Sequence, residues 1–169
     1  MNYFELFSIP ANYSVNQAQL SETYRSLQKE CHPDNFVMHS DVEKLRAMQQ
    51  STEINYAYQT LKNNCLRAQY LLLLAGLDID LEKKTLQDID FLMQQMQWRE
   101  TLESFTENEE DQLEAFNELI SEKVTELEAL IEDQLKKNQL EETANSIRKL
   151  KFMLKLHVEI ESIEDKFWG

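Results

Sequence analysis

Apolar side chains in the first part of the chain recur at the spacing of helix faces. Intervals of four, three and four positions place these residues on one helical stripe: Leu20, Tyr24, Leu27 and Cys31. Ser14 or Asn16 can cap this helix, because either side chain can accept a hydrogen bond from a backbone N–H of the first turn. Arg25 and Lys29, four positions apart, fall on a different face that we expect to be solvated.

A second helical stripe follows Asp41, which we expect to cap it. Its apolar members are Leu45, Met48, Ile54, Ala57, Tyr58 and Leu61. Between the two stripes stands Pro33, which fixes its own φ and cannot continue a helix, so this segment is a loop. The pattern predicts an antiparallel helical hairpin. A third, short helix over residues 66–75 is expected to end at Gly76, which suits the left-handed closing position.

The next predicted helix carries more apolar surface than one interface can bury. It starts with a sequence typical of a capping box, Thr85-x-x-Asp88, and extends to about Phe105. One stripe is largely aromatic: Phe91, Trp98, Leu102 and Phe105. A second stripe on nearly the opposite side holds Ile89, Leu92, Met93 and Met96. Aromatic side chains bury the most area, so we assign the first stripe to the core. The second stripe, which continues into Gln97 and Glu100, is the better binding surface, because methionine adapts to a partner.

Two long helices complete the predicted second unit. The first has a nearly heptad stripe of Leu113, Phe116, Ile120, Val124, Leu127, Ile131 and Leu135. After a polar turn at residues 137–139, the second has Leu140, Ala144, Ile147, Leu154 and Val158. Phe152 stands off this stripe, and we expect its side chain to be exposed. Three stripes with short connections predict an antiparallel three-helix bundle, and the chain as a whole is predicted to be all-α.

Charge separates the two units. The chain has 169 residues and a formal net charge of −14. Of its 31 acids and 17 bases, 24 acids and 11 bases lie in residues 76–169, so that half carries −13 and residues 1–75 about −1. We therefore expect two domains, residues 1–75 and 85–169, joined by a linker over 76–84. Such an acidic surface argues against nucleic acid or an anionic membrane as partner.

No feature of the sequence predicts a cofactor, a metal site or export. Cys31 and Cys65 are isolated, and we expect both to be small buried hydrophobic residues. The longest apolar run, residues 70–75, is too short to span a bilayer. The start of the chain lacks the basic and apolar regions of a signal peptide, which favours a reducing cytoplasm.

The loop holds the tripeptide His32-Pro33-Asp34, with a Tyr-Phe-x-Leu-Phe opening at residues 3–7 and Ile54-Asn55-x-Ala57-Tyr58 downstream. Together these motifs resemble the J-domain of DnaJ-type co-chaperones. The resemblance implies that the loop and the preceding helix bind a DnaK-type chaperone at its nucleotide domain and linker and speed ATP hydrolysis. The implied contact residues are His32, Pro33, Asp34, Arg25 and Lys29. Two positions depart from the usual pattern: Asn35 replaces a common Lys, and Cys31 a common aromatic residue.

A J-like unit followed by such a bundle, without a Gly/Phe-rich linker or a repeated Cys-x-x-Cys-x-Gly module, resembles the HscB family of iron–sulfur cluster assembly co-chaperones. Further matches are residues 91–93 and 148–152. This resemblance implies an L-shaped arrangement of the two units, with the chaperone HscA and the scaffold protein IscU as partners. The scaffold-binding positions it implies are Leu92, Met93, Met96, Gln97, Glu100 and Phe152. Gln97 and Ser104 stand where the family often has acids, so the apolar centre would dominate affinity.

Other interpretations of the same residues remain open. The chain could be a general J-domain co-chaperone that delivers unfolded clients to a DnaK-type ATPase. The loop could be a passive connector, and the second apolar stripe could pack against the first unit. An enzyme using His32 and Asp34 as acid and base would need a substrate pocket beside an exposed turn. No nucleophile elbow or Gly-rich loop accompanies them, so we expect a protein without catalytic activity.

Overall fold

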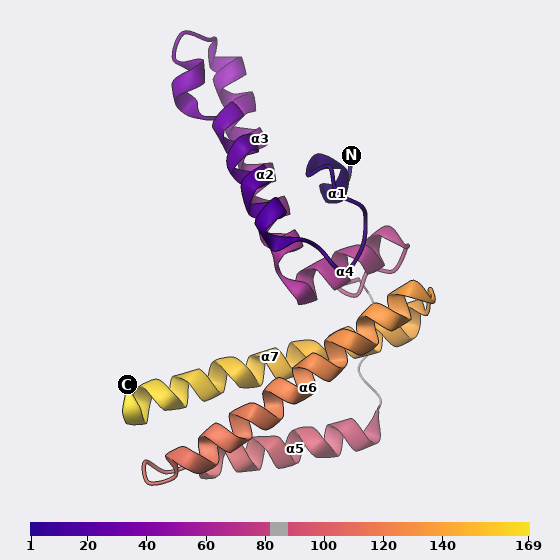
Figure 1. The fold of residues 1–169 in the computed structure, drawn as a ribbon, viewed down its shortest axis with the longest axis vertical. Coiled ribbons are helices and arrows are strands. Elements are labelled where there is room, and N and C mark those ends of the chain that lie inside the picture. Colours follow the sequence, from indigo (N-terminus) through magenta and orange to yellow (C-terminus); the bar gives the residue numbers. More distant parts are fainter. Residues whose placement is uncertain (82–87) are drawn as a thin grey trace. The chain divides into compact units, whose positions relative to one another are not determined.

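The computed structural model describes residues 1–81 and 88–169, and every regular element in those ranges is a helix. The chain divides into two compact units, Met1–Gly76 and Leu77–Gly169 (Figure 1). This confirms the all-α class, with a helical hairpin unit followed by a helical bundle. The predicted linker, residues 76–84, lies partly outside the described residues, and the L-shaped arrangement stays a prediction. None of the described helices is long and apolar enough to cross a membrane.

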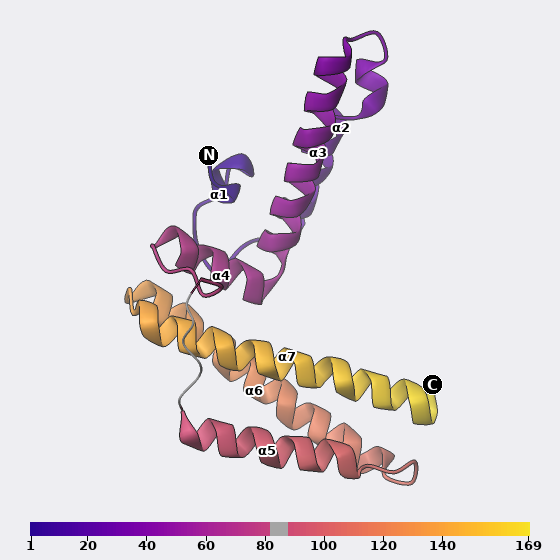
Figure 2. The same ribbon diagram turned by 180° about the vertical axis from the view of Figure 1, so that it is seen from behind.

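The first unit is built on two antiparallel helices, which lie side by side in both views (Figures 1 and 2). Its elements are α1 (Tyr3–Leu6), α2 (Gln17–Glu30), the 3-10 helix η1 (Pro33–Phe36), α3 (Asp41–Lys62) and α4 (Asn64–Leu74). Of the two candidate caps of α2, Ser14 and Asn16, it is the Asn16 side chain that accepts a hydrogen bond from the N–H of Gln19. The expected cap at Asp41 is off by one residue, because the Ser40 hydroxyl takes that role. Gly76 closes α4 with φ of +105°.

The core of the first unit lies toward the end of the hairpin where α1 and α4 sit, away from the α2–α3 turn (Figure 1). Its buried members are Phe4, Phe7, Leu20, Ile54, Ala57 and Leu61. The prediction that Leu45 and Met48 join this face is wrong, because both are more than half exposed. Ala47, which lies seven residues or two helical turns before Ile54, takes the inward position. The larger side chains of Leu45 and Met48 lie on either side of it.

The second unit consists of α5 (Ile89–Ser104), α6 (Glu110–Lys136) and α7 (Leu140–Trp168). A short turn with Asn138 at φ of 53° joins α6 and α7 into an antiparallel hairpin, which Figure 2 shows from behind. The buried side chains of α6 include five of the predicted stripe and one polar addition: Leu113, Phe116, Ile120, Leu127, Ile131 and Gln134. Gln134 accepts a hydrogen bond of 2.8 Å from the Ser146 hydroxyl, so this buried amide is satisfied inside the hairpin.

The predicted stripe of α7 is wrong in its second half. Val158 is 65% exposed, and Leu154 is only partly buried. The buried positions there are Leu150, Met153, Leu156 and Ile160. A single helical stripe describes packing against one neighbour. Helix α7 also contacts α5, through Phe152 and Lys149, and this turns its buried side away from Val158.

Candidate functional site

The α2–α3 turn presents three consecutive exposed residues. His32 has φ −61° and ψ 137°, the extended geometry expected before a proline, and it caps the 3-10 helix that Pro33 begins. Its Nδ1 accepts a hydrogen bond of 3.2 Å from the Asp34 N–H. Because Nδ1 accepts, the proton of the neutral imidazole sits on Nε2, and the Asp34 carboxylate, 3.5 Å from Nδ1, makes no ion pair in this form. That carboxylate is 86% exposed.

Asn35 ties the turn to the end of α2. Its side-chain amide donates to the carbonyl oxygen of Lys29 at 2.7 Å and, more weakly, to that of Glu30 at 3.4 Å. Its own N–H bonds the carbonyl oxygen of His32 at 3.0 Å. The Lys29 and Glu30 carbonyls lie in the last turn of α2, where the regular helical ladder ends, and that of Lys29 also accepts from the backbone N–H groups of Cys31 and His32. Asn35 adds a side-chain donor there and so links the turn to the helix end. A lysine here could not reproduce this planar amide contact.

The predicted basic residues stand on the outer face of α2. Arg25 and Lys29 are both exposed, and the ion pairs found among the described residues involve neither. Two cross-helix contacts hold α2 in register with α3. The Gln28 amide donates to the Ser51 carbonyl oxygen at 2.9 Å and its Oε1 accepts from the Ser51 hydroxyl at 2.6 Å. The charged face therefore has a fixed position relative to the turn.

The downstream motif is structural. Ile54 and Ala57 are core residues, whereas Asn55 accepts a hydrogen bond of 3.1 Å from the Tyr24 hydroxyl. The Tyr58 ring stacks on that of Tyr24 with centroids 4.2 Å apart. All four residues thus fasten α3 to α2. The motif therefore matters to the tripeptide, because a rigid hairpin holds the turn in a fixed position.

The tripeptide lies exposed at a turn, where a partner protein can reach it. The His32 ring, an exposed side chain, is not set against a nucleophile, and no metal-binding cluster of His, Cys, Asp and Glu occurs within residues 1–81 and 88–169. Cys65 is buried as expected, but Cys31 is only partly so. Burial, with a smaller contribution from Glu30, raises the pKa of the Cys31 thiol. A raised pKa disfavours the nucleophilic thiolate form.

The second candidate surface is the outer face of α5. Leu92, Met93 and Met96 are 39%, 58% and 65% exposed, and Gln97 and Glu100 continue the same face as exposed polar residues. Phe91, Trp98 and Leu102 are buried on the other side, which confirms the core assignment for these three. Phe105, the fourth residue of that stripe, is only partly buried. Thr85 lies outside the described residues, and the cap of α5 is Asp88, which accepts from the Phe91 N–H at 3.1 Å.

Aromatic packing on the inner side holds this face outward. Phe152 from α7 lies edge-on to Phe91 and stacks on Trp98, with centroids 6.0 and 6.4 Å apart. Arg99 sits over the Phe152 ring and forms an ion pair with Glu159. The expectation of an exposed Phe152 is wrong, because the ring is partly buried between α5 and α7. Its role in partner binding stays a prediction.

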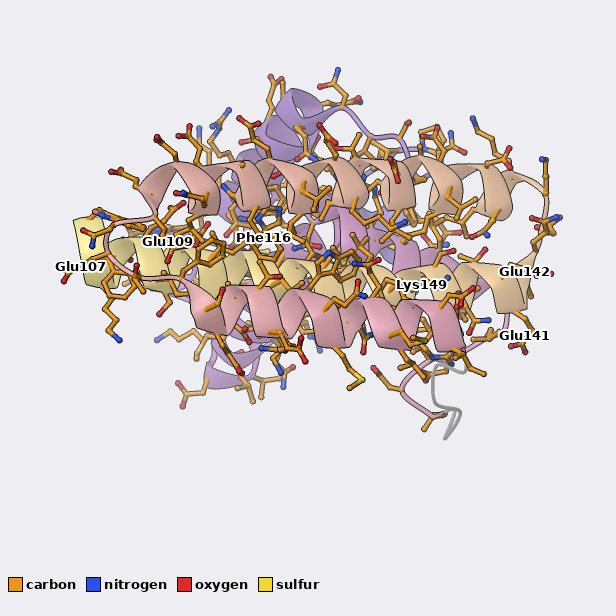
Figure 3. The ribbon with its side chains drawn as sticks, turned by 90° about the horizontal axis from the view of Figure 1, so that it is seen from below. Glu107, Glu109, Phe116, Glu141, Glu142 and Lys149 are labelled. Atoms are coloured by element: carbon orange, nitrogen blue, oxygen red, sulfur yellow. The ribbon has the colours of Figure 1, made fainter. Side chains whose placement is uncertain are left out.

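A second ion pair at the other end of α5 was missed from the sequence. The Lys149 ammonium lies 2.7 Å from the Asp88 carboxylate and over the Phe91 ring, between α5 and α7 (Figure 3). The Lys149 hydrogen bond, followed by the Phe91 N–H, holds the pKa of Asp88 below its usual value of 3.8. These residues are 61 positions apart, so no local pattern connects them.

Comparisons with known proteins match both units. A family model described as "DnaJ domain" matches residues 2–70, and one described as "HSCB C-terminal oligomerisation domain" matches residues 87–161. A co-chaperone protein HscB homolog of Psychromonas ingrahamii is 62% identical over 168 residues, 99% of each chain. The solved structure of chaperone HscB from Vibrio cholerae has a TM-score of 0.89 at 42% identity and covers 98% of this chain and 99% of its own. Human co-chaperone protein HscB gives 0.87 at 26% identity, over 97% and 82%.

Proposed function

The chain belongs to the HscB family of co-chaperones, and we propose that it couples two protein partners in iron–sulfur protein maturation. Its J-domain stimulates the ATPase of a specialised DnaK-type chaperone, HscA, and its bundle delivers the cluster scaffold IscU to that chaperone. The observation that carries this proposal is the exposure of one candidate surface on each compact unit. We place the protein in the cytoplasm, a reducing compartment that fits two free cysteines.

The geometry of the turn supports the first activity. His32 and Asp34 are held at a stiff tip by Pro33 and Asn35, so little conformational entropy is lost when they bind. The outward carboxylate of Asp34 can pair with a cation of the ATPase, and the Nε2–H of His32 can donate to an acceptor. Arg25 and Lys29 on the adjoining helix extend the contact. In this proposal the chain does not itself hydrolyse ATP. It acts by favouring the hydrolysis-competent state of its partner.

The outer face of α5 supports the second activity. An apolar centre of Leu92, Met93 and Met96 with polar neighbours Gln97 and Glu100 has the anatomy of a protein-binding patch. The flexible thioethers can adapt to the scaffold surface. Phe152 contributes by supporting the helix from behind and by the part of its ring that remains accessible.

A pair of variants separates the two activities. His32→Gln should abolish stimulation of HscA ATP turnover and leave calorimetric binding of IscU unchanged. Met96→Glu should weaken IscU binding by roughly 2 kcal/mol or more, because charge is forced into an apolar contact, while basal stimulation by the free chain persists. Leu119→Glu is the matched control, since Leu119 is an exposed leucine of the same unit on α6.

The outcomes decide the proposal part by part. Equal IscU affinity of Met96→Glu and the unaltered chain would remove the α5 patch. Loss of both activities in His32→Gln, with a lowered melting temperature, would mean that the change unfolds the hairpin. Tight binding of extended peptides without preference for IscU would favour the alternative, a general J-domain co-chaperone that delivers unfolded clients.

A further inference from the structure

A groove of about 550 Å³ opens beside the tripeptide in the first unit. Its apolar walls come from the turn and from the early part of α3: Pro33, Phe36, Val37, Ala47 and Met48. The volume falls within the range of sites that bind ligands or clusters of side chains. The side chains of His32 and Asp34 point to solvent and do not form part of this groove. The groove is therefore a second surface beside the tripeptide.

The hydroxyl and thiol groups of the groove already have partners within the unit. The Ser51 hydroxyl donates to Gln28, the Thr52 hydroxyl donates to the Met48 carbonyl oxygen, and the Cys31 thiol lies 3.7 Å from Oε1 of Gln50. Lys44 supplies the charged side chain among those that line it. A polar ligand would thus find few open hydrogen-bonding groups, whereas an aliphatic side chain would leave none unsatisfied.

The rim of the groove is also apolar. Val37 and Met48, which both line the groove, are each about two-thirds exposed. Large hydrophobic side chains gathered at one place on a surface mark an interaction site more often than scattered ones do. The exposed Met48 is one reason why the apolar pattern of α3 is broader than its buried face.

Charge alone is a weak source of docking energy for this hairpin. Helix α2 carries Arg25 and Lys29 but also Glu22 and Glu30, so its formal net charge is zero. Electrostatic steering toward an acidic partner needs an excess of one sign, and here the two signs cancel. The helix that leads into the tripeptide can therefore orient the partner, and its balanced charge leaves room for a second, apolar source of affinity.

We propose that the groove beside Pro33 binds aliphatic side chains of the same DnaK-type ATPase and supplies most of the docking affinity of the J-domain. Pro33 belongs both to the tripeptide and to the groove wall, so the two surfaces are continuous and one partner can cover both. This inference rests on the proposed function and assigns a division of labour within it. The tripeptide triggers hydrolysis, and the groove determines how tightly the chaperone is held.

Steady-state ATP hydrolysis by HscA, titrated with the full chain, tests this division. Met48→Gln should raise the half-saturating concentration about tenfold, because a polar side chain replaces part of the apolar wall. The maximal rate at saturation should remain that of the unaltered chain. Leu45→Gln is the matched control, since Leu45 is exposed on the same helix but does not line the groove. His32→Gln should lack stimulation at every concentration.

Each result supports or overturns the groove separately from the proposed function. An unaltered chain that never stimulates the ATPase would reject the proposed function and the groove with it. Stimulation with an unchanged half-saturating concentration in Met48→Gln would reject the groove alone. Equal weakening by Leu45→Gln would show that general apolarity of the tip, and not the groove, holds the partner. Sedimentation that shows self-association abolished by Met48→Gln would assign the groove to a second copy.

Ionic strength gives an independent reading of the same point. If apolar groups make the contact, the half-saturating concentration of the chain should stay nearly constant as salt rises from about 50 to about 200 mM. Screening over this range weakens contacts between exposed charges and leaves apolar contacts largely unaffected. A steep loss of affinity over this range, together with an unaffected Met48→Gln variant, would assign docking to Arg25 and Lys29 instead.

Discussion

The two units hold their candidate surfaces in position by different means. In the first unit, the exposed groups stand on a turn whose shape is set by residues within a few positions of it: Pro33 fixes the backbone and Asn35 binds the end of α2. In the second unit, the exposed face of α5 has its direction set by what the helix buries, namely Phe91 and Trp98 against Phe152 of α7. One surface is determined locally and the other by packing.

This difference affects how each surface responds to change. A locally determined turn keeps its shape as long as the hairpin that carries it is folded. A helix face can rotate or tilt when the packing behind it changes, even if no exposed residue is altered. The second surface should therefore be sensitive to core substitutions that leave the chain folded, and the first should respond mainly to unfolding of its unit.

Matched core substitutions give the largest expected effect. Leu61 in the first unit and Ile147 in the second are both fully buried aliphatic residues. Replacing either with Ala should cost about 3 kcal/mol of the unfolding free energy of its own unit. Leu61→Ala should reduce ATPase stimulation in proportion to the unfolded fraction and leave IscU affinity intact, whereas Ile147→Ala should weaken IscU affinity even where the bundle is folded. Thermal unfolding with calorimetry measures both.

The comparison fails if the effects cross between units. Loss of ATPase stimulation in Ile147→Ala, or loss of IscU affinity in Leu61→Ala, would show that the two units do not act as separate bodies. Unaltered affinity of the folded Ile147→Ala bundle would show that the α5 face does not respond to a cavity elsewhere in the core of its unit.

The same distinction explains what the sequence could predict. The cap at Asn16, one of two candidates, and the closing glycine at position 76 depend on near neighbours, and both are confirmed. The extended backbone at His32 likewise follows from the proline after it. The two stripes of α5 were also recognised, because a helix with apolar residues on opposite sides must leave one side uncovered.

The errors concern contacts between elements. Periodicity gives the angle between side chains on one helix but not the number of helices that flank it. Val158 was therefore placed in the core and Phe152 at the surface, although α7 buries a broader side against α5 and α6. For the same reason Leu45 and Met48 were assigned inward positions where Ala47 lies. Neither the Lys149–Asp88 pair nor the Gln134–Ser146 pair has a local signature.

A change at Asn35 tests local determination of the turn with a smaller effect. Asn35→Ala removes the side-chain donor to the Lys29 and Glu30 carbonyl oxygens and should lower the stability of the first unit by about 1 kcal/mol. Faster hydrogen exchange at the Asp34 amide would report loosening of the turn. Asn35→Asp is nearly isosteric but cannot donate, so it should be at least as harmful. An Asn35→Asp chain as stable and as active as the unaltered protein would show that the amide does not hold the tripeptide.

The smallest expected effect concerns the ion pair that ties the start of α5 to α7. The pKa of Asp88 is lowered in the folded state, chiefly by the Lys149 hydrogen bond and then by the Phe91 N–H. Because this pKa is lowered, the ionised carboxylate stabilises the folded state at pH values above its ordinary pKa of 3.8. That stabilisation is lost as the pH falls through the folded-state pKa. Asp88→Asn should therefore lower the melting temperature of the second unit slightly at pH 7, and the difference from the unaltered chain should shrink below pH 4. Glu118→Gln, an exposed mid-helix change, is the control. A difference that persists unchanged into acid would mean that the introduced amide caps α5 poorly, and that the ion pair with Lys149 contributes nothing to holding the helix face outward.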